Sequence, residues 1–257
     1  MMWTRALLKQ NAKVAFHRNY WSCVGVGVLT ALLSGGIVIG NSGTGYNFEE
    51  QTQHYGDATI GSLMAQIPPA FFVVFLLALI VGLVIGFAVS ILVSNVAEVG
   101  CCRYFLENRE HKTPISQVFY GFQGGRYSNT VWMMFLRMLY IFGWTLLFVI
   151  PGIVKSYSYM MVPYILAENP ELDRRRVFRL SSQMMRGHKW EAFVLALSFC
   201  GWVLLGIFSG NLVTIFYVNP YIHATMAEFY SALKAEASMK GIVQAGELPG
   251  VDIPEII

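Results

Sequence analysis

An apolar stretch with a Pro-Gly pair near its middle constrains the fold of this chain more than any other feature. It spans residues 144–167 and reads WTLLFVIPGIVKSYSYMMVPYILA, with Pro151 and Gly152 near the centre. So long an apolar run is untypical of a soluble surface. Because a Pro-Gly pair marks a turn, the stretch predicts two membrane helices joined by a tight turn.

A second stretch with a similar pattern begins at Trp202. It covers residues 202–224 and reads WVLLGIFSGNLVTIFYVNPYIHA. The residues that match the first stretch are Trp202, Leu204, Leu205, Gly210, Pro220, Tyr221, Ile222 and Ala224, opposite Trp144, Leu146, Leu147, Gly152, Pro163, Tyr164, Ile165 and Ala167. Repetition of this kind indicates a repeated structural unit, so a helical hairpin is the predicted building block.

The composition of the whole chain favours a lipid environment. Of its 257 residues, 55% are hydrophobic and only 13% are charged, and the mean hydropathy is +0.51. These values lie outside the usual range of soluble domains. We therefore predict an all-α integral membrane protein with about six transmembrane helices, arranged as three hairpins. The predicted spans are 21–39, 70–96, 130–150, 152–167, 192–209 and 212–233, in one membrane domain over 1–240, with a cytoplasmic tail over 241–257.

The distribution of Lys and Arg predicts the orientation of these spans. Residues 40–67 contain no Lys or Arg, whereas residues 168–190 carry the most basic connection in the chain. Since basic connections stay on the cytoplasmic side, we expect the first loop to face outward and the basic loop to face inward. Both termini are then cytoplasmic.

A cationic, partly amphipathic segment precedes each predicted hairpin. These segments are residues 5–20, 114–127 and 173–190. They favour contact with anionic lipid headgroups or with a membrane partner, while nucleic acid is disfavoured because no binding motif accompanies the basic residues. The candidate headgroup contacts are Arg5, Lys9, Lys13, Arg174, Arg175, Arg176 and Arg179.

Small residues recur every four positions in the first two spans. They are Cys23, Gly27, Ala31 and Gly35 in the first, and Ala78, Gly82, Gly86, Ser90 and Ser94 in the second. Small residues at this spacing allow two helices to approach closely in lipid. We expect spans one and two to pack together along these positions.

Two ionisable residues inside predicted spans need partners or water. Arg137 and Glu228 lie at similar expected depths in spans three and six. An unpaired charge is costly in the hydrocarbon core, so a structural ion pair between them is one hypothesis. A proton or substrate relay is the alternative, and Arg137 has the length to reach the inner headgroups.

Signatures of catalysis and of metal binding are absent from the sequence. It contains no G-x-S-x-G elbow, no H-E-x-x-H pair and no phosphate-binding glycine loop,. Its four cysteines, Cys23, Cys101, Cys102 and Cys200, lie in or beside apolar segments, which predicts ordinary thiols and no disulfide framework,. We predict a non-enzymatic protein without a cofactor or metal.

Three functions stay open at this point. The first is a membrane protein that engages lipids, a membrane partner or a second copy of itself. The second is a small-solute transporter or channel subunit, with a path between the repeated hairpins lined by Asn219, His223, Thr225 and Glu228,. A membrane-embedded enzyme is the third, and the sequence offers no catalytic residues for it.

The last two hairpins also resemble a known family. The residues that carry the resemblance are Ile150–Ile153 as IPGI, Tyr157 to Tyr159 as YSY, 164–170 as YILAENP, Ser181, Met184, Met185, Gly187, Pro220, Tyr221, Phe229 and Tyr230. They are similar to bacterial integral membrane proteins catalogued as domain of unknown function 975. The resemblance extends from the basic amino-terminal segment to Tyr230 and is weakest over 40–67. It implies a bacterial cytoplasmic membrane and several helical passes, and it implies no activity.

Overall fold

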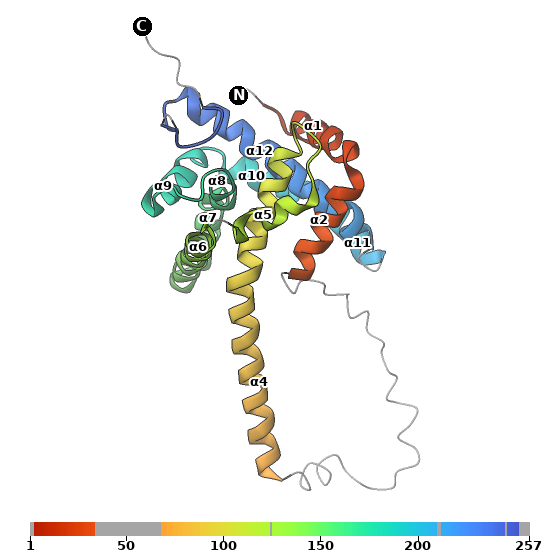
Figure 1. Cartoon of the computed structure of the whole chain (residues 1–257), viewed down its shortest axis with the longest axis vertical. Helices are drawn as coiled ribbons and strands as arrows, with labels where there is room; N and C mark the ends of the chain where they lie inside the picture. Colours follow the sequence, from red (N-terminus) through yellow and green to blue (C-terminus); the bar gives the residue numbers. More distant parts are fainter. Residues whose placement is uncertain (1–2, 34–67, 124, 210–211, 245, 252–257) are drawn as a thin grey trace.

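One continuous helix divides the molecule into two parts. It comprises α4 (Pro69–Val89), a π-helical turn η1 (Ser90–Ser94) and α5 (Asn95–Glu107). In this computed structural model, which describes residues 3–33, 68–123, 125–209, 212–244 and 246–251, all regular elements of the described residues are helical. Figure 1 shows α4 projecting from a helical body in which α5 takes part. The all-α prediction is confirmed for these residues.

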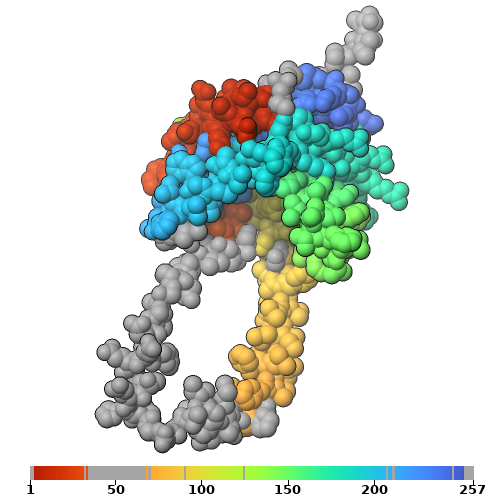
Figure 2. Space-filling view, turned by 180° about the vertical axis from the view of Figure 1, so that it is seen from behind, coloured from red at the N-terminus to blue at the C-terminus, as the bar shows by residue number. Residues whose placement is uncertain are grey.

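The composition of α4 explains why it stands apart from the body. Its sequence, PAFFVVFLLALIVGLVIGFAV, contains no polar side chain. The described side chains over 71–89 are exposed along the whole length of the helix. A helix that is apolar all round belongs in a protein core or in lipid. Figures 1 and 2, seen from opposite sides, both show α4 extending out of the body without another described helix beside it.

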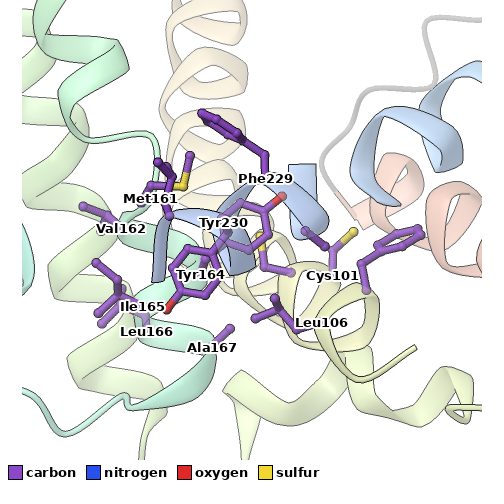
Figure 3. Close-up of a cluster of buried hydrophobic side chains, with 14 of the residues drawn as sticks. Cys101, Leu106, Met161, Val162, Tyr164, Ile165, Leu166, Ala167, Phe229 and Tyr230 are labelled. Carbon is purple, nitrogen blue, oxygen red and sulfur yellow. The ribbon is translucent and has the colours of Figure 1, made fainter. Parts of the chain in front are cut away.

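The body is built around α5, α8 (Val162–Glu168) and α12 (Asn219–Met239). Its buried side chains include those of Tyr104, Phe105, Ile165, Leu166, Phe229 and Tyr230. Figure 3 shows Tyr164 of α8 beside Tyr230 of α12, and their rings stack with centroids 5.2 Å apart. Aromatic side chains bury large apolar areas, so this cluster makes a major contribution to the core.

Two further helices from the amino-terminal part cover this core. Helix α1 (Arg5–Arg18) packs on α12, and α2 (Tyr20–Leu33) packs on α5 and on the π-helical turn η3 (Thr214–Val218). Helix α1 begins at a capping Thr4, whose side-chain oxygen accepts a hydrogen bond from the backbone of Leu7,. Residues 34–39 of the first predicted span and the predicted outward loop over 40–67 lie outside the described residues.

Close packing on α5 requires a glycine. A Cβ atom added at Gly100 would lie 1.8 Å from the carbonyl oxygen of Val118. Val118 belongs to the 3₁₀ helix η2 (Ile115–Phe122), which packs along α5. The sequence predicts that the second span ends at residue 96. The helix itself continues to Glu107, because small and apolar side chains of α5 are buried in the protein.

The hairpin after residue 127 is present, but its turn is displaced. Helices α6 (Tyr127–Leu147) and α7 (Val149–Ser158) pack on each other and are separated by Phe148, whose backbone is extended. The predicted turn at Pro151 and Gly152 is therefore wrong. Pro151 lies in the first turn of α7, where its missing N–H removes no helical hydrogen bond. Gly152 instead provides room for Thr145, whose Oγ1 would lie 2.3 Å from an added Cβ.

The fourth and fifth predicted spans are each divided. A turn at 159–161 separates α7 from α8, and a turn at Ser198 and Phe199 separates α10 (Lys189–Leu197) from α11 (Cys200–Phe208). Helix α11 then packs against η3, and Gly206 lies close to Thr214. Both hairpins thus place a glycine opposite a threonine, Gly152 opposite Thr145 and Gly206 opposite Thr214. The sequence repeat instead matches Gly152 with Gly210.

The small residues of the first two spans meet at one predicted position only among those described. Ser94 of the second span donates a hydrogen bond to the carbonyl of Leu33 at the end of α2, at 3.0 Å. Added Cβ atoms at Gly82 and Gly86 of α4 would have nothing within 4 Å, whereas one at Gly27 would lie 3.4 Å from Pro220 of α12. The expected close packing between spans one and two is therefore not formed by these glycines.

The basic loop contains the helix that its pattern predicts. Helix α9 (Arg174–Met184) begins at Asp173, whose carboxylate accepts hydrogen bonds from the backbone of Arg175 and Arg176 at 3.0 and 3.3 Å. Val177, Leu180 and Met184 are buried on one face. The predicted amphipathic pattern is confirmed.

Candidate functional site

Exposed apolar side chains form the largest unusual surface of the molecule. Within the described residues, three helices are long and apolar enough to cross a membrane: Phe71–Glu107, Tyr127–Leu147 and Lys189–Gly206. Exposed side chains also gather at the α6–α7 turn and near the end of α11; they are Leu146, Leu147, Phe148, Val149, Ile150, Leu204, Leu205 and Phe208. Figure 1 shows the ends of α2, α6 and α11 on the side of the body from which α4 projects. Soluble monomers rarely expose apolar surface on this scale.

The α6–α7 turn is suited to an apolar environment. The N–H of Phe148 donates to the carbonyl of Trp144 at 3.1 Å, and the N–H of Gly152 donates to the carbonyl of Phe148 at 3.2 Å. The start of a helix leaves several N–H groups without an intrahelical acceptor. Pro151 has no N–H, so it reduces the number of unpaired donors at this exposed turn.

All basic side chains lie away from α4. The 18 Lys and Arg residues of the chain fall within residues 5–18 and 103–240. The described helix α4 lies between these two ranges and has no charge. The molecule therefore has a cationic body and an uncharged projection.

The predicted headgroup contacts of α1 differ from one another in their surroundings. Arg5 and Lys13 are exposed, while Lys9 is half-buried with its ammonium 4.5 Å from the ring centroid of Phe199. Burial, and then repulsion from Lys13 and Arg5, lower the pKa of Lys9. Lys9 is thus partly sequestered in the body.

The predicted contacts of α9 divide in the same way. Arg174, Arg175 and Arg179 are exposed. Arg176 forms a two-point ion pair with Glu247, with N–O distances of 2.5 and 2.7 Å, and also donates to the carbonyl of Ile242 at 2.6 Å. Its guanidinium therefore holds the carboxyl-terminal segment.

Arg137 and Glu228 each pair with another residue. The guanidinium of Arg137 lies 3.0 Å from Glu98, and Glu228 accepts from Arg109 at 2.9 and 3.3 Å. The predicted pair between Arg137 and Glu228 is not formed. Both actual partners lie on or just after α5, between the second and third predicted spans, so a pairing argument confined to the spans omits them.

The side chains proposed to line a path are part of the core. His223 stacks on Phe105 with ring centroids 5.5 Å apart, and Thr225 donates to the carbonyl of Tyr221 at 2.8 Å. Asn219 is half-buried at the start of α12, and Glu228 is held by Arg109. These contacts favour packing and structural roles for them.

A charged cleft of about 680 Å³ opens between α5, α12 and residues 249–251. Glu168 at the end of α8 accepts from Tyr230 at 2.9 Å and from Lys234 at 2.5 Å. On α5, Arg103 pairs with Glu107 at 2.6 Å. Charges in this cleft are largely matched, which suits a hydrated surface better than the hydrocarbon core.

The carboxyl-terminal segment closes one side of the cleft. Lys234 donates to the carbonyl of Pro249 at 3.1 Å, and Asn169 donates to the carbonyl of Glu247 at 3.0 Å. Leu248 and Val251 are buried. Hydrogen bonds from Arg176 lower the pKa of the Glu247 carboxyl, against the effect of burial. The predicted tail is thus docked on the body over 246–251, while 252–257 lie outside the described residues.

Candidate metal and thiol sites are few. The described residues hold no group of three or more His, Cys, Asp or Glu side chains that could bind a metal ion. Cys23, Cys101 and Cys102 are buried free thiols and Cys200 is an exposed one. None of these thiols takes part in a disulfide.

Comparison with known proteins gives a family but no activity. No curated protein and no solved structure matches the chain. The family model described as Protein of unknown function (DUF975) matches residues 58–237. This range contains α4 and the whole series of helices from α5 to α11, with most of α12, and it leaves α1 and α2 outside. The chain belongs to the DUF975 family of proteins of unknown function.

Proposed function

We propose that this protein is a non-enzymatic integral membrane protein in which α4 crosses the bilayer and the helical body lies against the cytoplasmic surface. The observation that carries the proposal is the unbroken apolar exposure of α4. Its 21 residues rise about 1.5 Å each, which gives about 31 Å, and the hydrocarbon core is about 30 Å thick. Lipid is the environment that such a helix needs when no protein covers it.

The charge distribution supports the orientation. Basic residues remain on the cytoplasmic side of a membrane, and every Lys and Arg of the chain lies outside α4, in the sequence ranges that form the body. Both described ends of the chain, α1 and residues 246–251, are also part of the body. The chain then crosses the membrane an even number of times. Among the described residues, α4 provides one of these crossings, whereas α2 packs on α5 and η3 and is part of the body.

The other apolar hairpins have the dimensions for partial insertion. On α6 the exposed apolar residues are concentrated from Met138 to Leu147, with Trp132 as an exposed apolar side chain before them. Residues 138–147 make about 15 Å of helix and therefore about half of the hydrocarbon core. Residues 162–167 of α8 are buried against the body, so α8 does not lengthen α7 toward lipid. We infer that the α6–α7 and α10–α11 hairpins enter the near leaflet, in place of the further crossings that the sequence predicts.

The absence of catalytic motifs and the matched charges of the cleft support a role without catalysis. A membrane scaffold that contacts anionic lipids, with a possible membrane partner or second copy of the chain, agrees with these features. A transporter would require a path beside His223 and Thr225, where the described side chains are packed together. The proposed location is a bacterial cytoplasmic membrane, as the family resemblance implies.

Labelling of engineered cysteines in intact cells tests the crossing. In a Cys200→Ser background, Pro68→Cys places a thiol just before α4, and Lys112→Cys places one on the body. We expect a membrane-impermeant maleimide to label residue 68 in intact cells and residue 112 only after the membrane is opened. Labelling of residue 112 in intact cells, or protection of residue 68 until lysis, would contradict the proposed arrangement.

A further inference from the structure

Three cationic side chains lie where the two apolar hairpins join the body. Lys155 lies on α7, Lys189 is the first residue of α10, and Arg186 lies in the turn before it. Helices α7 and α10 pack on each other, and the rings of Tyr157 and Phe193 meet edge to face at 6.3 Å. We propose that Lys155, Arg186 and Lys189 form a binding site for the phosphate group of an anionic lipid, an inference that rests on the proposed membrane location.

The charges of Lys155 and Arg186 both act on Lys189. Burial, followed by repulsion from Lys155 and Arg186, lowers the pKa of Lys189. Lys155 and Lys189 are half-buried, and Arg186 is exposed. A phosphate between them would relieve this repulsion and would accept hydrogen bonds from both amines and from the guanidinium.

Carboxylates near the cluster are engaged elsewhere. Glu191, in the first turn of α10, lies 2.7 Å from Nδ1 of His188. Glu236 lies 3.1 Å from Nε2 of the same histidine and 2.5 Å from Lys240. Among the residues that the structure describes, none of the three proposed ligands forms an ion pair. The cluster therefore has positive charge that no described carboxylate neutralises.

The surroundings of Lys155 place the cluster at the level of lipid headgroups. From Phe148 at the tip of the hairpin to Lys155 there are seven residues, or about 10 Å of helix. A lysine at this distance from the tip reaches the headgroups because its long apolar stem lets the ammonium extend toward water. The ammonium of Lys155 lies 5.0 Å from the ring centroid of Trp144 and 5.7 Å from that of Tyr159. Trp and Tyr concentrate at membrane interfaces, and their rings attract cations.

Lipid is favoured over a soluble anion because apolar surface adjoins the cations. Trp190, next to Lys189, is 72% exposed and stacks on Phe193 at 5.2 Å. Ile153 and Val154, just before Lys155, are exposed as well. A ligand with both a phosphate and acyl chains satisfies the cations and this apolar surface together. Inorganic phosphate satisfies the cations alone.

The test measures which lipids stay bound to the full chain. Wild-type protein is reconstituted in vesicles of phosphatidylcholine and phosphatidylglycerol, extracted in mild detergent, and the retained lipids are counted by mass spectrometry. We expect phosphatidylglycerol to be enriched over its share in the vesicles. The double variant Lys155→Gln/Lys189→Gln should lower this enrichment about tenfold or more, since each basic residue contributes to anionic-lipid attraction.

Two matched variants separate this site from general charge effects. Lys112→Gln/Lys240→Gln removes two exposed charges that are not among the candidate headgroup contacts and should leave the enrichment unchanged. Lys155→Arg/Lys189→Arg keeps the charge and should retain the enrichment. Equal enrichment in wild type and the Lys155→Gln/Lys189→Gln variant, an equal fall in the Lys112→Gln/Lys240→Gln variant, or loss in the Lys-to-Arg variant would each overturn the proposed site.

Two further readouts identify the source of the phosphate and the level of any failure. Millimolar inorganic phosphate should leave the bound phosphatidylglycerol in place, and displacement would overturn a lipid site in favour of a free-anion site. Flotation of the vesicles reports membrane insertion separately. If all variants float with the vesicles but show no selectivity, only the phosphate site is wrong; if the wild type does not float, the membrane proposal itself fails.

Discussion

Helices α4 and α5 are two halves of one continuous helix, yet they have opposite surroundings. Along α4 the side chains over 71–89 are exposed, whereas most of α5 is buried, including Cys101, Tyr104 and Phe105. Helix α5 also carries Glu98, which pairs with Arg137 of α6, and Arg103, which pairs with Glu107 of α5 itself. Helix α4 has no polar side chain that would need a partner. Composition, not helix propensity, thus decides which half is covered by protein.

The π-helical turn η1 marks the boundary between the two halves. A π-turn inserts an extra residue into a helix and rotates the face that follows. After η1 the helix presents small residues, such as Gly100, to neighbouring segments of the body. The comparison therefore predicts that the same kind of substitution has different consequences on the two sides of η1.

A charge in the middle of α4 should produce the largest effect. Leu83→Arg places a guanidinium near the proposed bilayer centre, where insertion costs about 3 kcal/mol. We expect most of the variant to be lost from the alkali-resistant membrane fraction, as measured by immunoblot. Leu7→Arg, at an exposed position of α1, is the control and should behave as wild type. Normal recovery of Leu83→Arg would contradict lipid exposure of α4.

Adding one methyl group should distinguish the two halves almost as strongly. Gly100→Ala brings a Cβ against the carbonyl of Val118, and overpacking of this kind costs about 2–3 kcal/mol. Gly86→Ala meets nothing within 4 Å and should leave the melting temperature of the detergent-solubilised protein unchanged or slightly higher. Equal melting temperatures for the two variants would show that α5 is not tightly packed.

The ion pair of Glu98 on α5 and that of Arg109, just after α5, should differ in strength. Glu228 is 9% exposed and binds Arg109 at two points, while Glu98 is 41% exposed. Glu228→Gln leaves a partly buried guanidinium without its counter-charge, and we expect a loss of about 2 kcal/mol. Glu98→Gln should cost about 1 kcal/mol or less. Denaturant unfolding of both variants measures the difference, and a larger loss for Glu98→Gln would reverse the assignment.

The smallest effect concerns the carboxyl-terminal segment and depends on pH. Because Arg176 lowers the pKa of Glu247 from its ordinary value of 4.5, this pair contributes full stability above about pH 4.5, and the contribution is lost as the pH falls through the lower, folded-state pKa. The hydrogen-exchange protection factors of residues 246–251, corrected for the pH dependence of the intrinsic exchange rate, should therefore fall at acid pH, with a loss of about 1 kcal/mol or less. In Glu247→Gln the protection should be low at neutral pH as well. Equal wild-type protection factors at both pH values would remove Arg176 as the anchor of this segment.

The sequence predicts the exposed half of this helix better than the buried half. Uninterrupted apolar residues identify α4, and elsewhere in the chain the amphipathic pattern of residues 173–190 identifies α9. The burial of α5 is missed because its charged residues resemble a solvated connection when their partners are unknown. The ion-pair partners of Glu98 and Arg109 are identified only when α6 and α12 are placed beside α5.

Turn residues in the local sequence also failed to predict the position of the turn, which depends on tertiary contacts. Pro151 and Gly152 are typical turn residues, yet the first turn of a helix accepts Pro, and Gly152 is needed for contact with Thr145. The docking of residues 246–251 depends on Arg176 and Asn169, which are far away in the chain. Neither partner is visible from the composition of the carboxyl-terminal segment itself.

Photolabelling from within the bilayer tests the contrast between α4 and α5 most directly. The protein is reconstituted with a lipid that carries a diazirine on its acyl chain, illuminated, and digested for peptide mass spectrometry. We expect carbene adducts on every turn of residues 71–89 and none on residues 95–107. Adducts on α5, or an α4 that carries none, would contradict the claim that lipid covers one half of this helix and protein the other.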